Sequence, residues 1–417
     1  MKVFANPDLI QSGEQVRELA EKLKSEKIIS FDTEFIRETT FFPVVEIIQV
    51  STDKESWIVD AKAFKHKNSD PKALQPLLDI FEDPAILKIL HAAQGDQECL
   101  YTSFGVVATP TLDTSVAASL CGYGEAVGLG NLLKSVLNVQ IKKGHARTDW
   151  SVRPLPPQLA EYAHADVEHL VELGVKLMEQ LEKLGRKEWA LELSAKWEEK
   201  KLYQANPEET AQKLARGGRL DKRGYSALIE LVKWREERVR VLNLPRRWVA
   251  DDNVLMDLAH VRPKDLTHLS AFRGLNKGEL KNSGDAILAA LNRANDAQDV
   301  ALPKLPKPDV ANEAESQVLD LMKCYVGILA DRLRIASKHL LTASQFLPVL
   351  RSKAKSSQDL VKAGILTEGA AHLIGEEMVA LIQGRRALSI NGTQIKIVEL
   401  DREGAAGTSS SAGSVVG

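Results

Sequence analysis

The sequence of 417 residues lacks several features that define large classes of protein. Its three cysteines, Cys99, Cys121 and Cys324, are far apart and include no CxxC pair, which excludes a disulfide scaffold and a zinc ribbon. No apolar run approaches the roughly 18 residues of a membrane span. The first residues, MKVFANPDLIQSGEQ, have no apolar segment behind a basic start, so we do not expect a signal peptide. Together these absences predict a cytoplasmic protein that has no membrane partner.

A net charge is almost absent as well. The chain has 55 basic and 57 acidic residues and a formal charge of −2, so its overall charge does not indicate nucleic acid. The charge is unevenly distributed, however, because the segment 213–247 has eleven Lys or Arg against four Asp or Glu. Such an excess can follow a phosphate backbone, but a solvated helix face with i,i+4 ion pairs explains it equally well.

The first part of the chain mixes strand and helix patterns. Three short strand patterns, at 27–35, 44–52 and 55–61, are followed by a helical pattern at 71–83 and another apolar run at 85–93. We therefore predict an α/β domain whose mixed sheet opens with an antiparallel meander and is flanked by helices. After this part strand signals almost vanish, and residues 157–185 have the pattern of one long helix.

Composition also predicts the domain boundaries. We expect a first domain at 1–205 and all-helical domains at 213–295 and 313–390. The segment 296–312 between the helical domains contains Pro303, Pro306 and Pro308, which prevent a helix and favour an extended linker. The last residues, 402–417, are rich in Gly, Ser and Ala, which predicts a disordered tail.

Four carboxylates stand out as candidates for chemistry. Asp32 and Glu34, in the strand pattern SFDTEFI, are two positions apart and so share one face of the strand. Asp96 follows an apolar run in LHAAQGDQECL, and Asp166 in EYAHADVEHL shares a helix face with Tyr162, four residues earlier. Taken singly, an edge strand, a helix cap and a surface hydrogen bond would explain them. Taken together, they predict a divalent cation such as magnesium, because carboxylates held close to one another need a counter-charge.

The same three stretches resemble a known family. FDTEF, LHAAQGDQECL and EYAHADVEHL resemble the three exonuclease motifs of the DEDD superfamily, in the subclass with a tyrosine four residues before the last aspartate. The lead-in TDWSVRPL before the third motif is similar to the ribonuclease D family and is the most specific of these signals. The resemblance covers essentially the whole chain, since the stretch around NLPRRWV resembles a helicase-and-RNase-D C-terminal (HRDC) domain. It implies a ribonuclease H-like exonuclease domain followed by two all-α HRDC-type domains.

The resemblance also implies an activity and a set of functional residues. It implies a 3′–5′ exoribonuclease that releases 5′-mononucleotides by a two-metal mechanism. Asp32, Glu34, Asp96 and Asp166 would hold two Mg²⁺ or Mn²⁺ ions, and Tyr162 would position the attacking water. The substrate would be RNA with a single-stranded 3′ end, especially tRNA precursors and other small RNAs that undergo 3′ maturation, and we expect a monomer.

Nucleic-acid contacts are predicted at two places. His91 and Gln94, next to Asp96, could line a substrate groove, and the basic residues that could contact phosphate are Arg235, Arg246 and Arg247. Packing explains His91 and Gln94 about as well, and a solvated helix face explains the arginines about as well. The nearby LDT motif also resembles the family, but its acid, Asp113, could be structural and is left outside the metal set.

Two other functions stay open at this point. The first is a related 3′–5′ exonuclease that acts on DNA, because the same metal chemistry cleaves both backbones. The second is a non-catalytic RNA-binding protein with a decayed nuclease fold, against which the complete carboxylate set with Tyr162 argues.

Overall fold

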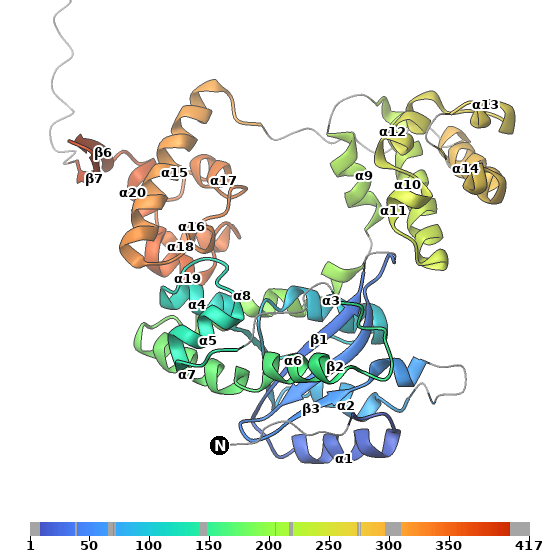
Figure 1. Ribbon diagram of the computed structural model, residues 1–417. Coiled ribbons are helices and arrows are strands. Elements are labelled where there is room, and N and C mark those ends of the chain that lie inside the picture. Colours follow the sequence, from blue (N-terminus) through green and yellow to red (C-terminus); the bar gives the residue numbers. More distant parts are fainter. Residues whose placement is uncertain are drawn as a thin grey trace, which may run out of the picture. The chain divides into compact units, whose positions relative to one another are not determined.

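The computed structural model describes residues 9–37, 40–65, 70, 72–141, 148–204, 206–216, 220–272, 275, 277–296 and 310–400 (Figure 1). Most of the predicted linker and all of the predicted tail, 402–417, lie outside the described residues. The chain divides into two compact units. The first comprises 1–114, 133–174 and 194–309, and the second comprises 115–132, 175–193 and 310–417. The predicted first domain is therefore divided between the two units.

A five-stranded sheet, in the order β3-β2-β1-β4-β5, forms the centre of the first unit (Figure 1). The strands are β1 (Ile28–Ile36), β2 (Val44–Ser51), β3 (Ser56–Val59), β4 (Leu87–Leu90) and β5 (Thr111–Asp113). β1, β2 and β3 pair antiparallel, whereas β4 pairs parallel with β1 and β5 pairs parallel with β4. The predicted mixed sheet with an antiparallel start is thus confirmed.

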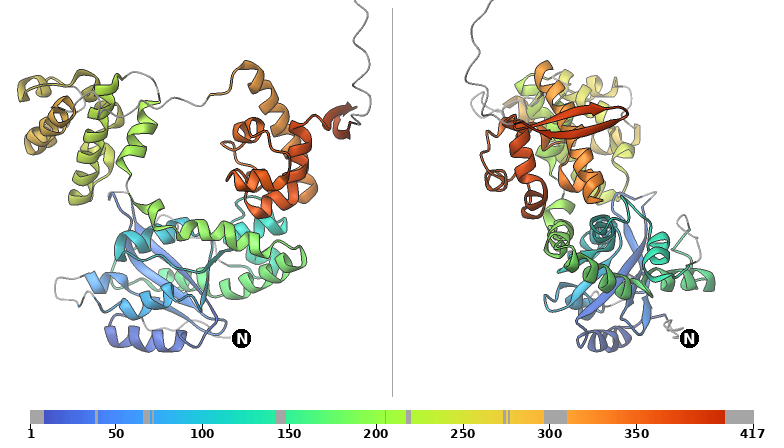
Figure 2. Two further views of the ribbon diagram at one scale, coloured as in Figure 1. Left: turned by 180° about the vertical axis from the view of Figure 1, so that it is seen from behind. Right: turned by 90° about the vertical axis from the view of Figure 1, so that its left-hand side faces the viewer.

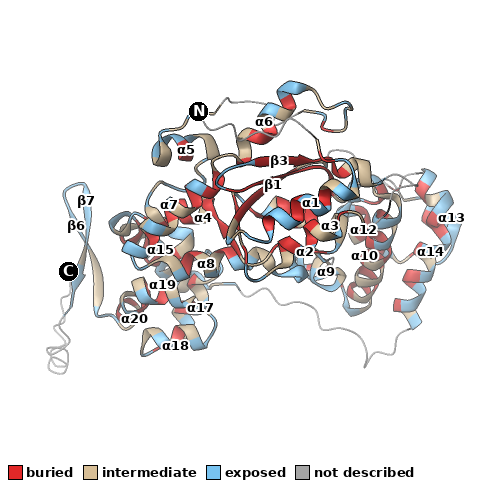
Figure 3. Cartoon of the chain, turned by 90° about the horizontal axis from the view of Figure 1, so that it is seen from below, coloured by how far each residue is buried: buried red, intermediate tan, exposed pale blue. Residues whose placement is uncertain are grey.

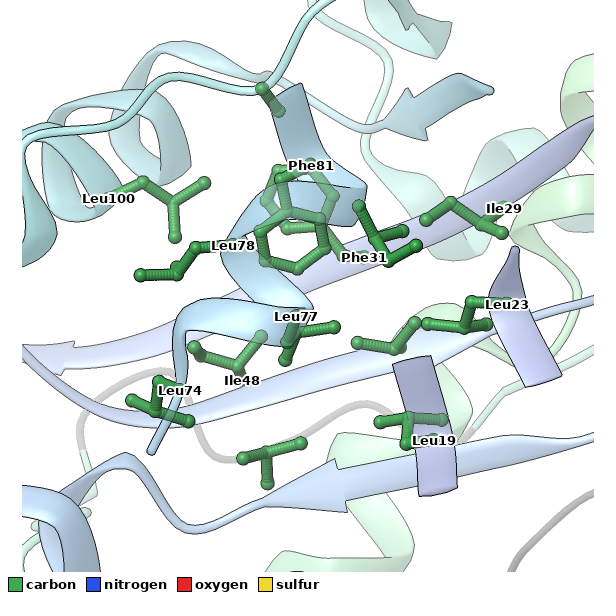
Figure 4. Close-up of a cluster of buried hydrophobic side chains, with 14 of the residues drawn as sticks. Leu19, Leu23, Ile29, Phe31, Ile48, Leu74, Leu77, Leu78, Phe81 and Leu100 are labelled. Carbon is green, nitrogen blue, oxygen red and sulfur yellow. The ribbon is translucent and has the colours of Figure 1, made fainter. Parts of the chain in front are cut away.

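Three helices pack on one face of this sheet. They are α1 (Gly13–Leu23), α2 (Gln75–Glu82) and α3 (Gln94–Phe104). Ile29 and Phe31 of β1 point to this side, where the rings of Phe31 and Phe81 stack with their centroids 4.5 Å apart (Figure 4). Leu77 and Leu100 complete the surroundings in the same close-up. This face of β1 therefore belongs to the main hydrophobic core.

The opposite face of the sheet is covered by α6 (Pro157–Val167). Pro157 stands at the first helical position, where its missing N–H has no intrahelical partner to lose. Leu159 and Ala163 of α6 pack against Ile47 of β2 and Ile58 of β3. Figure 3 shows the buried strands between α6 on one side and α1 and α2 on the other. The face of β1 that carries the predicted acids is therefore the face beneath α6.

The predicted long helix at 157–185 is wrong, because the structure has two helices there. α6 ends at Val167 and α7 (Leu170–Lys183) begins three residues later. In an uninterrupted helix the carbonyl of Val167 would accept a bond from the amide four residues further on. Here that carbonyl accepts a 2.7 Å hydrogen bond from the hydroxyl of Ser51, and the hydroxyl of Ser30 lies 3.3 Å from it. The break comes from a tertiary contact, since neither Glu168 nor His169 is a helix breaker.

Helices form the part of the chain between 207 and 296, in agreement with the predicted fold class. They are α9 (Pro207–Ala215), α10 (Lys222–Leu242), α11 (Arg246–Val249), α12 (Asp252–Val261), α13 (Leu266–Ser270) and α14 (Lys277–Asp296). Asp221 caps the start of α10, where its side chain accepts from the amide of Gly224, and Asn243 caps its end with a left-handed φ of 48°. Leu228 and Leu231 of α10 and Leu258 of α12 lie in the core of this helical part.

The remaining helical segments are α4 (Thr114–Cys121), α5 (Leu129–Leu137), α8 (Lys187–Ala195), α15 (Glu313–Leu333), α16 (Ser337–Leu340), α17 (Phe346–Arg351), α18 (Ser357–Lys362), α19 (Glu368–Ala370), α20 (Glu376–Ile382) and the short turns η1 (Ala61–Lys65), η2 (Lys196–Glu198), η3 (Lys200–Tyr203) and η5 (Ala371–Gly375). None of the helices in the described ranges is both long and apolar enough to cross a membrane.

The helical pattern predicted up to 390 ends too late, because a β-hairpin begins before that point. β6 (Arg386–Asn391) and β7 (Gln394–Glu399) form the two-stranded ribbon in the right-hand view of Figure 2. Asn391 pairs with Gln394, so Gly392 and Thr393 form the two-residue turn, and Gly392 has a φ of 63°. Alternating aliphatic residues around a two-residue turn that begins with Gly are a hairpin signal, which our interpretation of the sequence overlooked.

Candidate metal centre

β1 delivers the first two acids to the face beneath α6. Asp32 lies opposite Gln49 of β2, and Glu34 lies opposite Ile47, whose side chain packs beneath α6. The pairing shifts between Glu34 and Phe35, where the register passes over one residue of β2. Bulges of this kind bend a strand and re-aim its side chains. The alternation expected from sequence is confirmed, since Asp32 and Glu34 emerge on one face.

α6 brings the third acid to the same place. Ligand oxygens of Asp32, Glu34 and Asp166 all lie within 4.8 Å of one another, a spacing that could hold a metal ion. Tyr162, one helical turn before Asp166, shares a side-chain hydrogen bond with it. The structure therefore gathers three of the four predicted carboxylates and the predicted tyrosine at one point of the sheet.

Asp96 adjoins this cluster from α3. Its Oδ1 accepts hydrogen bonds from the backbone amide of Thr33 at 3.0 Å and from the Thr33 hydroxyl at 2.6 Å. Its carboxyl group is also hydrogen-bonded to that of Asp32. Two carboxyl groups can share a hydrogen bond only if one holds a proton, so the metal-free pair retains a proton that a cation would displace.

Burial and mutual repulsion raise the pKa values of these acids. Burial raises the pKa of Asp32 to about 6, and burial together with the charge of Asp32 raises that of Asp166 to about 7. Burial and the charges of Asp32 and Asp166 raise the pKa of Glu34 to about 9. Burial and Asp32 raise the pKa of Asp96 well above its ordinary range. Hard oxygen ligands that resist ionisation without a counter-charge fit Mg²⁺ or Mn²⁺.

Tyr162 stays a neutral donor in this setting. Burial, followed by the charges of Asp166 and Glu34, raises the pKa of the Tyr162 phenol further above its ordinary value of 10.0. Its hydroxyl therefore keeps its proton at any physiological pH. A protonated phenol beside the carboxylates can hold and orient a water molecule by hydrogen bonding.

Asp113, which we left outside the metal set, fixes the turn before α3. Its carboxylate accepts hydrogen bonds from the amides of Ala92 at 2.9 Å and Ala93 at 3.0 Å. Ala92 has a φ of 60°, a conformation that non-glycine residues adopt only where the surroundings hold them in it. Asp113 thereby sets the direction in which α3 leaves β4, and with it the position of Asp96. The sequence could have indicated this structural role, because Asp113 ends the strand β5, which pairs with β4 in the sheet.

The two polar candidates near Asp96 lie on the same turn. Nδ1 of His91 and the hydroxyl of Thr114 are 2.9 Å apart, and the side chain of His91 is partly buried. Gln94 is exposed at the first position of α3. Only Gln94 is thus displayed openly to solvent.

The three arginine candidates have different environments. Arg247 is exposed, and Arg246 forms two hydrogen bonds, of 2.6 and 2.7 Å, with the carboxylate of Glu236. The side chain of Arg235 is only 2% exposed and bonds Oδ1 of Asp252 at 2.6 Å. The prediction that Arg235 contacts RNA is therefore wrong, because its guanidinium is used inside the helical core.

Known proteins resemble the chain along almost its whole length. Residues 7–182 match the family described as 3′-5′ exonuclease, and residues 226–291 match the HRDC domain. Ribonuclease D of Granulibacter bethesdensis is 31% identical over 399 residues, which cover 95% of this chain and 97% of that protein. Ribonuclease D of Bartonella henselae is 34% identical over 323 residues, 77% of this chain and 78% of that protein.

A solved structure gives the same result. The crystal structure of Escherichia coli RNase D, described as an exoribonuclease involved in structured RNA processing, has a TM-score of 0.76 and 25% identity. The match covers 91% of this chain and 99% of that one. The exonuclease match and the HRDC match agree with these relatives. The chain therefore belongs to the ribonuclease D family and is a 3′–5′ exoribonuclease.

Proposed function

We propose that this exoribonuclease hydrolyses RNA at Asp32, Glu34, Asp96 and Asp166 with two bound Mg²⁺ or Mn²⁺ ions, and that Tyr162 makes it a tyrosine-type member of its superfamily. The observation that supports the proposal is the meeting of Asp32, Glu34 and Asp166 within 4.8 Å. When bound, two such ions supply a nucleophilic hydroxide at neutral pH and neutralise charge on the attacking and leaving oxygens.

The positions of the side chains suggest a role for each. Asp32 shares a hydrogen bond with Asp96 and lies close to both Glu34 and Asp166, so it would be the carboxylate that two ions share. Asp96 would serve one ion, and Glu34 with Asp166 the other. The neutral hydroxyl of Tyr162 would hold the attacking water in line with the last phosphodiester, because positioning of a water molecule needs a donor that stays protonated.

We propose tRNA precursors and other small RNAs with a single-stranded 3′ extension as substrates, processed by a monomer in the cytoplasm. The relative from Escherichia coli is described as acting in structured RNA processing, which supports a structured substrate class. We further propose that the helices α15 to α20 act as a second HRDC-like domain. Arg247, exposed at the start of α11, is the basic side chain we expect to meet the phosphates.

A direct test uses the full chain and a 3′-extended tRNA precursor labelled at its 5′ end. With Mg²⁺ or Mn²⁺ the wild type should shorten the 3′ end one nucleotide at a time and release 5′-mononucleotides. Asp32→Asn should abolish cleavage and still bind the RNA, whereas Asp53→Asn, which changes an exposed carboxylate, should cleave normally. Cleavage by Asp32→Asn would contradict the site, and faster digestion of a matched DNA oligonucleotide would contradict the RNA substrate.

A further inference from the structure

Three serines form a row across the sheet beneath α6. Ser30 of β1 lies opposite Ser51 of β2, and Ser51 lies opposite Ser56 of β3. All three are completely buried, with 0% exposure. We call them the serine row. Side chains on one face of a strand recur every second residue. Ser30 is two residues before Asp32, so the serine row and Asp32 lie on the same face of the sheet.

The serine row bonds α6 at two points. The hydroxyl of Ser51 donates to the carbonyl of Val167 at 2.7 Å, and the hydroxyl of Ser30 lies 2.7 Å from that of Ser51. Each hydroxyl has a single proton, so Ser30 donates to Ser51 while Ser51 donates to Val167, and every group is satisfied. Ser56 and Nδ1 of His164 share a hydrogen bond of 2.8 Å. The two points on α6 are three residues apart, about one helical turn.

These bonds determine where α6 stops. Val167 directly follows Asp166, and its carbonyl is bonded to the serine row instead of continuing the helix into α7. The apolar contacts of Leu159 and Ala163 with the sheet are non-directional and tolerate sliding. The hydrogen bonds to the buried hydroxyls do not tolerate sliding, because a shift of α6 would leave buried polar groups without partners.

We propose that the serine row consists of positioning residues, which hold Asp166 at the distance from Asp32 and Glu34 that a divalent ion requires. The cation site is then formed by the fold before the cation binds. The inference rests on the proposed metal site. It adds that metal affinity depends on hydroxyls that touch neither the metal nor the RNA.

The test measures Mn²⁺ binding to the full-length protein by titration calorimetry or electron paramagnetic resonance, without RNA. Removing both donors in Ser30→Ala/Ser51→Ala should weaken Mn²⁺ binding about 5- to 30-fold, the factor that corresponds to one or two hydrogen bonds. Ser51→Ala should weaken it less, because Ser30 lies 3.3 Å from the Val167 carbonyl and can replace the lost donor. Ser30→Ala should have the smallest effect, since Ser51 still donates.

Two further readouts separate positioning from a general loss of structure. Hydrogen exchange at the last turn of α6 should speed up in the double variant while β1 stays protected, and excess Mn²⁺ should restore most of the cleavage rate. Ser119→Ala is the matched control, because Ser119 is buried and its hydroxyl has no partner in the part of the chain that the structure describes. It should bind Mn²⁺ as the wild type does.

The outcomes distinguish the two proposals. Asp166→Asn should lose Mn²⁺ affinity, and if it does not, the proposed metal site itself is wrong. If Asp166→Asn loses affinity but both single serine variants and the double variant bind Mn²⁺ like Ser119→Ala, only the positioning role is refuted. If the double variant does not fold, the order of the two single variants decides the question.

Discussion

Replacing Glu34 by glutamine should stabilise the metal-free protein while it destroys the activity. Burial and the charges of Asp32 and Asp166 raise the pKa of Glu34 from 4.5 to about 9. At pH 7 the folded protein therefore keeps this proton, whereas the unfolded chain has released it. Each pH unit between the unfolded pKa of 4.5 and pH 7 lowers the free energy of unfolding by about 1.4 kcal/mol, because the folded protein keeps a proton that the unfolded chain releases. At pH 7 the total loss of stability is about 3 kcal/mol. Glutamine has nearly the same shape as glutamate and does not titrate, so the Glu34→Gln variant does not lose this stability as the pH rises.

The sign of the effect follows from the number of bound protons. Between pH 4.5 and about 9 the folded wild type holds one more proton at Glu34 than the unfolded chain does. Its free energy of unfolding must therefore fall as the pH rises through this window. The Glu34→Gln variant lacks this dependence, so the two proteins should be equally stable near pH 4 and differ most near pH 9.

The assay is urea unfolding in EDTA at several pH values, with hydrogen exchange at the β1 amides to report on the first unit. Glu55→Gln, which changes a glutamate whose side chain is 55% exposed, is the control and should follow the wild type. Added Mg²⁺ should stabilise the wild type by mass action and Glu34→Gln much less. Parallel pH profiles for the wild type and Glu34→Gln, or a less stable variant at pH 7, would refute the reasoning.

Other parts of the chain give three more predictions. Asp113→Ala should lower the free energy of unfolding by about 3 kcal/mol in urea denaturation and reduce turnover, because the amide of Ala92 and the buried amide of Ala93 lose a charged acceptor. Burial opposes the ionisation of Asp60, but side-chain hydrogen bonds from Arg153 and Gln11 lower its pKa below the ordinary value. Asp60→Asn should therefore be less stable than the wild type at pH 7, and urea denaturation should show this difference vanishing as the pH falls through the folded pKa. In salt-dependent RNA binding, Arg247→Ala should reduce the slope by about 1, whereas Arg235→Ala should destabilise the helical core by about 1–3 kcal/mol in thermal unfolding, because the buried carbonyl of Ala250 loses its donor.

The acids of the candidate metal centre could be predicted because local rules place them. Alternation along a strand puts Asp32 and Glu34 on one face, and helical spacing puts Tyr162 and Asp166 on another. Neither rule says that the two faces meet. Segments separated by more than a hundred residues come together through packing of α6 on the sheet, and only the family resemblance supplied that information before the structure did.

The errors have a common physical cause, since tertiary contacts override local patterns. The helix at 157–185 is interrupted because Ser51, which itself accepts from Ser30, donates to the carbonyl of Val167, and no rule of helix propensity contains a serine on a distant strand. Arg235 was counted with the surface charge of its segment. Its spacing of four residues from the buried Leu231 was the signal that it points to the core.

β1 connects the stability of the enzyme to its chemistry, because its two faces have different tasks. Ile29 and Phe31 anchor the strand in the main core, and Asp32 and Glu34 emerge on the other face. A slip of one residue would exchange the faces, so that acids would enter the core and a phenylalanine would enter the metal centre. Packing of the apolar face therefore fixes the register of β1 and with it the position of the acids. It does so although repulsion between the carboxylates opposes folding at this place. A site of this charge can persist without its cation only on a strand that is fixed so firmly from the other side.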